Sequence, residues 1–441
     1  MKRKMKRKIV PLLMVISLAF LPIPQQLSAQ TATPGSQPRY AVQTLRSLGG
    51  TYATAQQMTN SGLVSGDSNL SGDTTEHGVV WRVDGSIIDL GTLGGPSSAV
   101  GQVNEQGLIV GVSETANIDP LGENWGILLD CNPNGNPCQG YQNTVVAVTW
   151  QDGVITPLPT LGGNNAQAPF TTGLNNKGEA VGFAETSIQD PSCIAPQILD
   201  LEAVIWGPKK GEIRELPPVP GDSVGAAFAV NEAGQVVGLT GPCGFPSFSL
   251  GLHAVLWQNG VVRSLPTLGG LMNNAALSIN NRGQIVGTSD LPGDTVTHAV
   301  MWRDGKITDL GTLPGDYFSF AYGINDRGQV IAQSCDINFN CRAALWRNGV
   351  MTDLNALTPP GSLYLMVAYH INNQGDITGT GIDPNTGDTP AFVAVPCDEA
   401  HIDMGCQDAA QSTDGSGVRP RVVLPESVRN RLRQRTFVGH Y

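Results

Sequence analysis

A degenerate repeat is the feature of this sequence that most constrains its fold. Its clearest copy contains Asn325-Asp-Arg-Gly328 and runs on to Leu354. Six copies have Asn at the first marker position, the first copy has Thr, and a Gly follows three residues later in all seven. The markers are Thr59, Asn104, Asn175, Asn231, Asn280, Asn325 and Asn372, with Gly62, Gly107, Gly178, Gly234, Gly283, Gly328 and Gly375. Repeats of this length are typical of propellers, solenoids or arrays.

Each copy contains four short apolar runs separated by turn signals. Asn-x-x-Gly between the first two runs favours a type I turn. Asp-Gly or Asn-Gly between the last two runs predicts a tight hairpin in which both turn residues have positive φ. These pairs are Asp84-Gly85, Asp152-Gly153, Asn259-Gly260, Asp304-Gly305 and Asn348-Gly349. Six copies end the third run on Trp, at Trp81, Trp150, Trp206, Trp257, Trp302 and Trp346, and Ala394 takes that place in the seventh. The pattern predicts an all-β, seven-bladed β-propeller with four antiparallel strands per blade.

The two ends of the repeat array complement each other. The segment from Tyr40 to Leu48 has the sequence of a fourth run with no copy before it, and the last copy stops after its third run, at Val395. We therefore expect the N-terminal strand, residues 42–45, to complete the last blade beside residues 391–395. Closing the ring in this way protects the sheet edges.

The units resemble a known family. His253-Ala-Val-Leu-Trp257, His298-Ala-Val-Met-Trp302, Leu90-Gly-Thr-Leu-Gly-Gly95 and Ile324-Asn-Asp-Arg-Gly-Gln-Val330 are similar to the bacterial extracellular HAF repeat. The resemblance covers residues 40 to about 395, and it departs from the pattern at Gly78 and at Val146, Glu202, Arg342 and Pro390. It implies an exported bacterial repeat protein, and it brings no established activity or catalytic residues.

The N-terminus has the layout of a secretory leader. Six Lys and Arg precede an apolar stretch that contains Pro11 and ends before Ala29, where cleavage is expected. That stretch is shorter than the roughly 18 residues that a membrane anchor needs, so residues 1–29 are interpreted as a signal peptide. Without them we expect no segment that spans a membrane, and a secreted or periplasmic, monomeric protein.

Export allows the eight cysteines to pair. Spacing suggests Cys131 with Cys138, Cys335 with Cys341 and Cys397 with Cys406, which leaves Cys193 with Cys243. Eight cysteines allow about 105 pairings, so the connectivity stays open. The spacings do not resemble those of a zinc ribbon.

Charge limits the partners. The chain has 37 acidic residues against 26 Lys and Arg, and six of these bases lie in the leader. Such an acidic body argues against a nucleic-acid partner. The propeller is expected to occupy residues 30–406, followed by a linker and a basic tail over residues 407–441. Disorder is the default expectation for this tail, and the sharper hypothesis is that it contacts an acidic polymer, the envelope or the acidic face of the propeller itself.

Candidate chemistry is sparse. Glu114 and Glu185 occupy matching positions at the expected start of two long loops, where a carboxyl pair could serve glycoside hydrolysis. Asp383, Asn385 and Asp388 could form a loose Ca²⁺ site, although the full EF-hand spacing is missing. His77, His253 and His298 lie too far from the axis to share a metal, so each is expected to hydrogen-bond within its own blade. The Asn markers are explained by their turns. We expect no cofactor, since no P-loop, G-x-S-x-G or dinucleotide motif occurs.

Function is the least determined property. In a propeller the long connections between second and third strands lie at the end opposite to the tight turns. The insertions at residues 114–144 and 186–201 make that end the expected binding surface, while an equally open alternative is that their disulfides only limit proteolysis. The sequence favours a non-catalytic module that binds or scaffolds an extracellular protein or carbohydrate. The alternative is a propeller hydrolase or lyase that acts on extracellular polysaccharide.

Overall fold

Seven four-stranded antiparallel sheets form the fold, as the repeat predicts. The computed structural model describes residues 39–123, 125, 143–168, 173–243, 251–359, 361–397 and 421–435. The predicted leader, the predicted linker up to residue 420, Cys131, Cys138 and Cys406 lie outside this part of the chain. The propeller belongs to the compact unit Pro38–Tyr441. Within the described residues, no helix has the length and apolar composition that crossing a bilayer requires.

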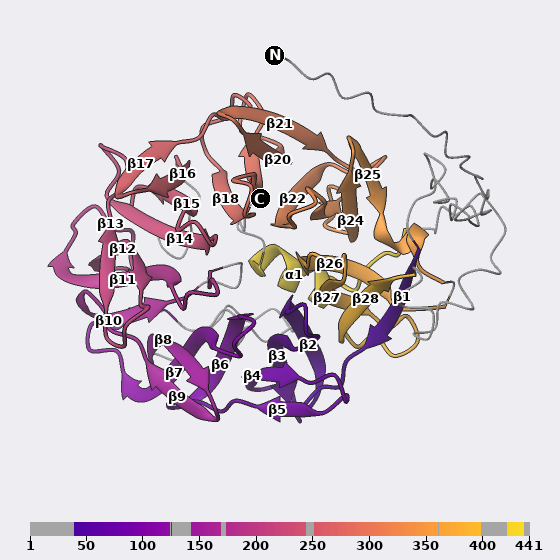
Figure 1. Ribbon diagram of the computed structural model, residues 1–441, viewed down its shortest axis with the longest axis horizontal. Helices are drawn as coiled ribbons and strands as arrows, with labels where there is room; N and C mark the ends of the chain where they lie inside the picture. The colour runs from indigo at the N-terminus through magenta and orange to yellow at the C-terminus, as the bar shows by residue number, and fades with distance from the viewer. Residues whose placement is uncertain are drawn as a thin grey trace, which may run out of the picture. The chain divides into compact units, whose positions relative to one another are not determined.

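The blades follow one another along the chain and around the ring (Figure 1). Blade 1 contains β2 (Gly49–Met58), β3 (Val64–Leu70), β4 (Glu76–Trp81) and β5 (Ile87–Asp89). Blade 2 contains β6 (Gly94–Val103), β7 (Ile109–Ile118), β8 (Asn143–Gln151) and β9 (Val154–Pro157). Blade 3 contains β10 (Gly162–Gln167), β11 (Ala180–Gln189), β12 (Leu199–Trp206) and β13 (Ile213–Leu216).

The remaining blades repeat this order. Blade 4 contains β14 (Val224–Val230), β15 (Val236–Gly241), β16 (His253–Gln258) and β17 (Val261–Ser264). Blade 5 contains β18 (Asn274–Ile279), β19 (Ile285–Asp290), β20 (Thr297–Arg303) and β21 (Lys306–Gly311). Blade 6 contains β22 (Phe318–Ile324), β23 (Val330–Cys335), β24 (Cys341–Arg347), β25 (Val350–Asp353) and the short 3₁₀ helix η1 (Leu354–Leu357).

Blade 7 is built from both ends of the propeller sequence. It contains β26 (Tyr364–Ile371), β27 (Ile377–Ile382), β28 (Ala391–Pro396) and β1 (Tyr40–Thr44). β1 pairs with β28 in antiparallel register, with Val42 opposite Ala394 and Thr44 opposite Phe392. The predicted ring closure is therefore confirmed.

Apolar side chains hold neighbouring blades together. One cluster joins Ala203 and Leu216 of blade 3 to Val230 and Trp257 of blade 4, and the other interfaces are built in the same way. Five of the six repeat Trp residues are buried, and each of their indoles packs between sheets and donates its N–H to a carbonyl of the link before its blade. These bonds run from Trp81 to Arg46, Trp150 to Leu90, Trp206 to Pro159, Trp257 to Pro217 and Trp302 to Pro266, at 2.7–2.9 Å.

The hairpin turns follow the prediction with one exception. Both residues have positive φ at Asp152-Gly153, Asn259-Gly260, Asp304-Gly305 and Asn348-Gly349. At Asp84-Gly85 only Gly85 has positive φ. This turn is one residue longer than the other four: the N–H of Gly85 bonds the carbonyl of Arg82, and the N–H of Arg82 bonds the carbonyl of Ser86.

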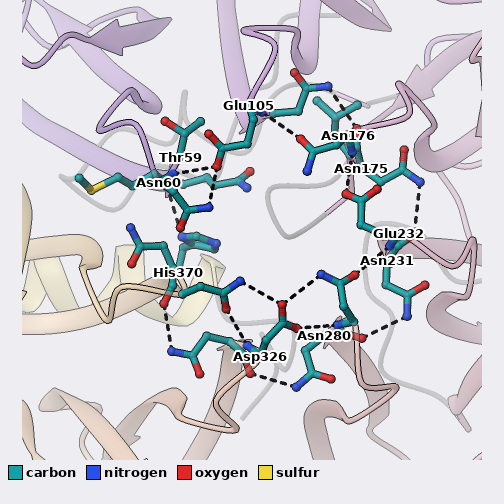
Figure 2. Close-up of a pocket in the computed structure, with 18 of the residues that line it drawn as sticks. Thr59, Asn60, Glu105, Asn175, Asn176, Asn231, Glu232, Asn280, Asp326 and His370 are labelled. Carbon is teal, nitrogen blue, oxygen red and sulfur yellow. Dashed lines mark hydrogen bonds between the residues drawn. The ribbon is translucent and has the colours of Figure 1, made fainter.

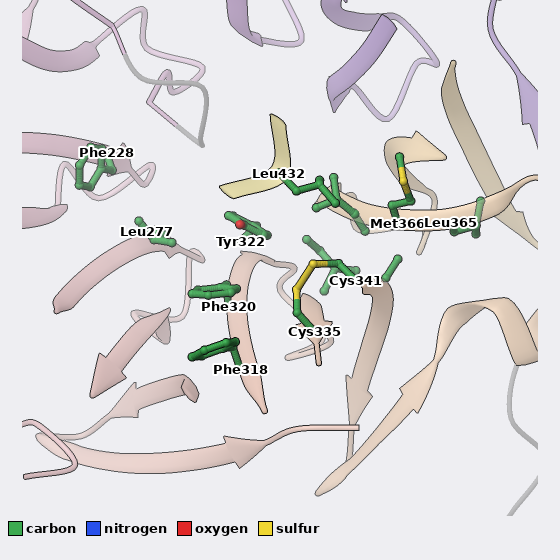
Figure 3. Close-up of a cluster of buried hydrophobic side chains, with 14 of the residues drawn as sticks. Phe228, Leu277, Phe318, Phe320, Tyr322, Cys335, Cys341, Leu365, Met366 and Leu432 are labelled. Atoms are coloured by element: carbon green, nitrogen blue, oxygen red, sulfur yellow. A yellow bond between two sulfur atoms is a disulfide. The ribbon is translucent and has the colours of Figure 1, made fainter. Parts of the chain in front are cut away.

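The C-terminal segment differs from the expectation of disorder. Residues 421–435 include α1 (Glu426–Arg435), which lies inside the ring beside β26 (Figure 1). Leu424, Val428 and Leu432, spaced four residues apart, are buried in the apolar cluster around the axis, which we call the axial core. Figure 3 shows Leu432 among its side chains, with Tyr322 and Met366. A helical apolar stripe therefore overcomes the polar and basic composition on which the prediction of disorder rested.

Acidic and aromatic groups of the propeller also hold this segment. Arg421 pairs with Asp316 and with Asp336, the latter at 3.2 Å. The guanidinium of Arg431 lies 4.5 Å from the ring centre of Tyr52, and that of Arg433 lies 5.1 Å from that of Phe339. The tail thus contacts the acidic face of its own propeller, which was one of the hypotheses drawn from its charge.

We predict that replacing Gln43 with Pro destabilises the ring. The N–H of Leu45 bonds the carbonyl of Ala391, and the N–H of Cys397 bonds the carbonyl of Arg39. Because the N–H groups of an antiparallel strand point alternately toward and away from the neighbouring strand, the N–H of Gln43 faces β28 and that of Thr44 faces outward. Both side chains are exposed, so Gln43→Pro removes only a ladder bond and should cost about 1–3 kcal/mol in chemical unfolding. Thr44→Pro is the matched control. Equal losses in the two variants would contradict the closure.

We also predict that Val428→Asp releases α1. A buried carboxylate without a partner would oppose the apolar contact, so trypsin should cleave within residues 421–435 at least about tenfold faster, as measured by mass spectrometry. Ser427→Asp, one residue away on a less buried position, should cleave at the wild-type rate. Unchanged cleavage of Val428→Asp would show that the docked helix does not depend on this contact.

Candidate functional site

The tight-turn end of the ring carries a cavity on the propeller axis. Its volume is about 150 Å³, and residues at the ends of the innermost strands of all seven blades line it (Figure 2). The first ring around it consists of the marker residues, Thr59, Asn104, Asn175, Asn231, Asn280, Asn325 and Asn372.

The first ring confirms the turn role of the markers and adds a second role. Asn104 Oδ1 accepts the backbone N–H groups of Gln106 and Leu108, as a turn-forming Asn should. Its Nδ2 donates to the carbonyl of Asn175 in the next blade at 3.2 Å. The same link joins Asn175 to Asn231, Asn231 to Asn280, Asn280 to Asn325 and Asn325 to Asn372. In each of blades 2 to 6, one carboxamide therefore closes a turn and also joins two blades.

A second ring follows one residue later in the sequence. It alternates carboxamides and carboxylates, Asn60, Glu105, Asn176, Glu232, Asn281, Asp326 and Asn373. Each side chain from Glu105 onward accepts the backbone N–H of the residue at the same position in the preceding blade, at 2.8–3.0 Å. The sequence analysis missed this ring, although the residue after every marker is Asn, Asp or Glu.

His370 completes the wall of the cavity in blade 7. Its Nδ1 lies 3.5 Å from the backbone N of Met58 in blade 1. Gln57 and Gln102 occupy the same place in blades 1 and 2, where their Oε1 atoms accept the N–H groups of Val103 and Leu174. Burial lowers the pKa of His370 to about 4, which keeps the imidazole neutral and its Nδ1 able to accept.

The opposite end of the ring carries the long connections and the Gly-rich links between blades. Here α1 packs on the axial core through Val428 and Leu432. The insertions of blades 2 and 3 instead pack on each other. Glu123, fully buried, accepts the backbone N–H groups of Ile198 and Leu199 through Oε1, both at 2.7 Å, and the amide of Gln197.

A buried polar network supports this contact. Trp125 packs on Phe183 with ring centres 5.5 Å apart and donates its indole N–H to Gln197 Oε1. Gln197 Nε2 bridges the carboxylates of Glu123 and Glu185, each at 3.1 Å. Asn165 Nδ2 likewise bridges Asp119 and Glu185. The sequence analysis did not identify Asp119, Glu123 or Gln197, because nothing in one sequence shows that two insertions meet.

The two proposed catalytic carboxylates are buried anchors. Glu114 lies in β7 and Glu185 in β11, not at loop starts, and neither side chain is exposed. Glu114 accepts the N–H of Ser97, and Glu185 accepts those of Asn164 and Asn165. Asp290, at the same place in blade 5, accepts that of Asn273. All three hold the first strand of their own blade at or next to its start.

Glu185 is also the most strongly perturbed carboxyl of this network. Burial and then the neighbouring charge of Glu123 raise its pKa to about 8. The pair therefore holds a proton at neutral pH, and a carboxyl held in this way can stabilise the contact between the two insertions without reaching solvent.

The other predicted residues have local partners. His77 bonds Asp89, His253 bonds Asp222 and His298 bonds Asp309 at 2.8–3.0 Å, as expected for histidines that serve their own blades. Asp383, Asn385 and Asp388 lie in one short connection, where Asp383 Oδ1 accepts the N–H of Asn385 and the backbone of Asp383 pairs with Asp388. These hydrogen bonds within residues 383–388 close a turn.

Two of the predicted disulfides are confirmed. Cys193 bonds Cys243, which ties the connection of blade 3 to that of blade 4, and Cys335 bonds Cys341 within blade 6. Cys397 is disulfide-bonded as well, and its predicted partner Cys406 lies outside the described residues, as do Cys131 and Cys138.

Exposed aliphatic side chains stand on the supported insertions. Ile118 and Ile188, at the far ends of β7 and β11, are 62% and 63% exposed, and Leu121 and Ile194 are also exposed. The four belong to adjacent blades and flank the buried network of Glu123 and Gln197. The hydrogen bonds of Glu123 with residues 197–199 hold the insertions that carry these side chains.

Comparisons with known proteins find distant structural similarities only. No protein-family model and no curated protein matches the chain. Among solved structures, a puromycin-hydrolyzing peptidase of Mycobacterium tuberculosis is 13% identical over 81% of this chain and 56% of its own, with a TM-score of 0.47. An Aleuria aurantia lectin in complex with a fucosyl disaccharide is 8% identical over 81% and 96%, with a TM-score of 0.32. A Xanthomonas campestris gluconolactonase is 11% identical over 57% and 78%, with a TM-score of 0.31.

We predict that His370→Gln improves stability in acid. The wild type has a folded-state pKa of about 4 for His370 and an unfolded value of 6.5, so folding excludes a proton. The stability that this group contributes is complete above pH 6.5 and is lost as the pH falls toward 4, by on the order of 3 kcal/mol. Chemical unfolding at pH 7.5 and pH 4.5 should show a smaller drop for His370→Gln. His253→Gln, at an exposed histidine, is the control, and equal drops in all three proteins would refute the assignment.

Proposed function

We propose that this protein is a non-catalytic binding module that recognises a protein partner through the loop-bearing end of blades 2 and 3. The observation that carries the proposal is the group of exposed side chains Ile118, Leu121, Ile188 and Ile194 on the two supported insertions. Exposed aliphatic side chains on ordered insertions favour a protein surface over a polar polysaccharide as the partner.

The support beneath these residues is as relevant as their exposure. Glu123 receives three hydrogen bonds from residues 197–199, and the Cys193–Cys243 disulfide fixes the neighbouring connection. A surface that is already ordered loses little conformational entropy on binding, which leaves more of the contact energy for affinity.

The alternative, a hydrolase or lyase of extracellular polysaccharide, has less support. Glu114 and Glu185 are the carboxylates that the sequence offered for acid–base chemistry, and both are fully enclosed and bonded to backbone amides. A catalytic carboxyl has to reach its substrate. At the axial cavity, Glu105, Glu232 and Asp326 retain solvent access and serve as acceptors between blades.

We also propose that the module acts outside the cytoplasm of a bacterium. The leader-like N-terminus and the disulfides support a location outside the cytoplasm, and the resemblance to the HAF repeat supports a bacterial source. The acidic composition agrees with a partner other than nucleic acid.

The test compares two pairs of matched substitutions. Binding of the mature chain to an envelope fraction of the producing cell is measured by biolayer interferometry, before and after protease treatment of the fraction. We predict that Ile118→Asp with Ile188→Asp weakens binding at least about tenfold. Val83→Asp with Val154→Asp is the control: these valines are 76% and 61% exposed, in the β4–β5 turn and at the start of β9 at the other end, and this variant should bind as the wild type does.

Three results would contradict the proposal. One is equal binding by both double variants. Another is binding that survives protease and is competed by purified polysaccharide, which points to a carbohydrate partner. The third is release of reducing sugar that Glu114→Gln or Glu185→Gln abolishes, which points to the hydrolase.

A further inference from the structure

A pair of a basic and an acidic side chain recurs on the outer two strands of three blades. In blade 1, Nδ1 of His77 on the third strand lies 2.9 Å from Asp89 on the fourth. In blade 5, His298 and Asp309 are 3.0 Å apart, and in blade 6, Arg342 and Asp353 are 3.0 Å apart. In each case the acid lies opposite the residue two positions after the base, namely Val79, Val300 and Ala344. The pair is therefore a diagonal neighbour pair on one face of the sheet.

Blade 3 places two acids at these positions. Glu202 takes the place of the base, and Glu215, opposite Val204, takes the place of the acid. Asp200 lies two residues before Glu202 on the same strand and therefore on the same face. Where blades 1, 5 and 6 have a histidine or an arginine, blade 3 has a further carboxyl group.

Glu202 is enclosed and lacks a compensating group. Glu202 is only 8% exposed, and its side-chain oxygen Oε2 has no hydrogen-bond partner among the described residues. Oδ1 of Asp200 is also buried, and it has no hydrogen-bond partner among the described residues. Burial raises the pKa of Glu202 to about 8, and the charges of Asp200 and Glu215 add to the effect. Burial and the charge of Asp190 raise the pKa of Asp200 as well.

We propose that a calcium ion binds at Glu202, Glu215 and Asp200, in the place that an imidazole or a guanidinium group takes in blades 1, 5 and 6. Buried carboxylates are stable when they are paired or bind a metal. Ca²⁺ takes oxygen ligands, tolerates irregular geometry and completes its shell with water. The three carboxylates do not converge within one coordination sphere in this structure, so binding requires rotation of Glu215, whose side chain is exposed.

The position of the site connects it to the loop-bearing end. β12 begins at Leu199, directly after the blade 3 insertion, and the N–H of Asp190 bonds the carbonyl of Ile198 at the base of that insertion. An ion at Asp200 and Glu202 would thus stabilise the strand that directly follows Gln197 and Ile198. This inference does not depend on the proposed partner, since it concerns a metal and can be tested without one.

The experiment is a Ca²⁺ titration of the mature full-length chain after EDTA treatment, followed by calorimetry and thermal unfolding. Extracellular calcium modules bind with Kd of about 10⁻⁴–10⁻³ M, and we expect this range. Ca²⁺ at 10 times Kd should raise Tm, while NaCl of equal ionic strength should not. Glu202→Gln and Glu215→Gln should each weaken binding at least tenfold. Asp152→Asn removes one carboxylate at an exposed turn and should leave both the affinity and the shift unchanged.

Glu202→Arg gives a second, independent readout. It recreates the pairing of Arg342 with Asp353, so its Tm should equal or exceed that of the calcium-loaded wild type and should not respond to Ca²⁺. Glu215→Gln, at an exposed position, keeps the test valid if Glu202→Gln does not fold. The proposal is overturned if the wild type shows no heat and no Tm shift at 10 mM Ca²⁺, or if Glu202→Gln and Glu215→Gln respond as the wild type does. In that case Glu202 is protonated in the folded protein, and the free energy of unfolding should fall as the pH rises from about 4.5 to about 8.

Discussion

Seven sheets can share one axis only if the last sheet packs on the first, and here this depends on β1 pairing with β28. Without that strand, blade 7 would expose an unpaired edge, and the two chain ends would not be joined. The other six interfaces are continuous in sequence and have additional hydrogen bonds. The carboxamide of each marker Asn from Asn104 to Asn325 bonds the next blade, and the residue after the marker accepts an N–H from the blade before. Closure therefore completes a ring whose parts are already oriented by short polar contacts near the axis.

These contacts make the two ends of the propeller different. At the tight-turn end every blade contributes the same kind of polar group, so the cavity is shaped by requirements of assembly. At the other end the blades differ, since the connections of blades 2 and 3 are long and α1 packs on the axial core. Residues freed from the repeat, such as Ile118 and Ile188, can then be selected for a partner. The division between a uniform end and a variable end follows from how the chain crosses each blade.

Much of the fold follows from the sequence, because the repeat supplies seven examples of each element. The Asn-x-x-Gly turns, the Asp-Gly hairpins and the unmatched strand at Tyr40 predict the blade count, the strand order and the closure. Contacts between segments that do not repeat could not be predicted in this way. The meeting of Glu123 with residues 197–199 depends on how two insertions of unlike sequence fold together. The docking of α1 had a local signal, the spacing of Leu424, Val428 and Leu432, which the many Arg residues around it obscured.

The repeat also separates structural acids from acids that need another explanation. Glu114, Glu185 and Asp290 stand at one repeat position and each accepts a backbone N–H at or next to the start of the first strand of its blade, so their shared place explains them. Glu202 stands where other blades carry His77, His298 or Arg342, and it does not share their partner chemistry. A buried group that repeats with its partners supports the scaffold, whereas a buried group that departs from its equivalents must be satisfied by something those blades do not need. Burial raises the pKa of both Glu202 and Glu185. Glu185 has the same backbone partners as its equivalents in other blades, whereas Glu202 has not, and the two residues therefore differ in what their burial requires.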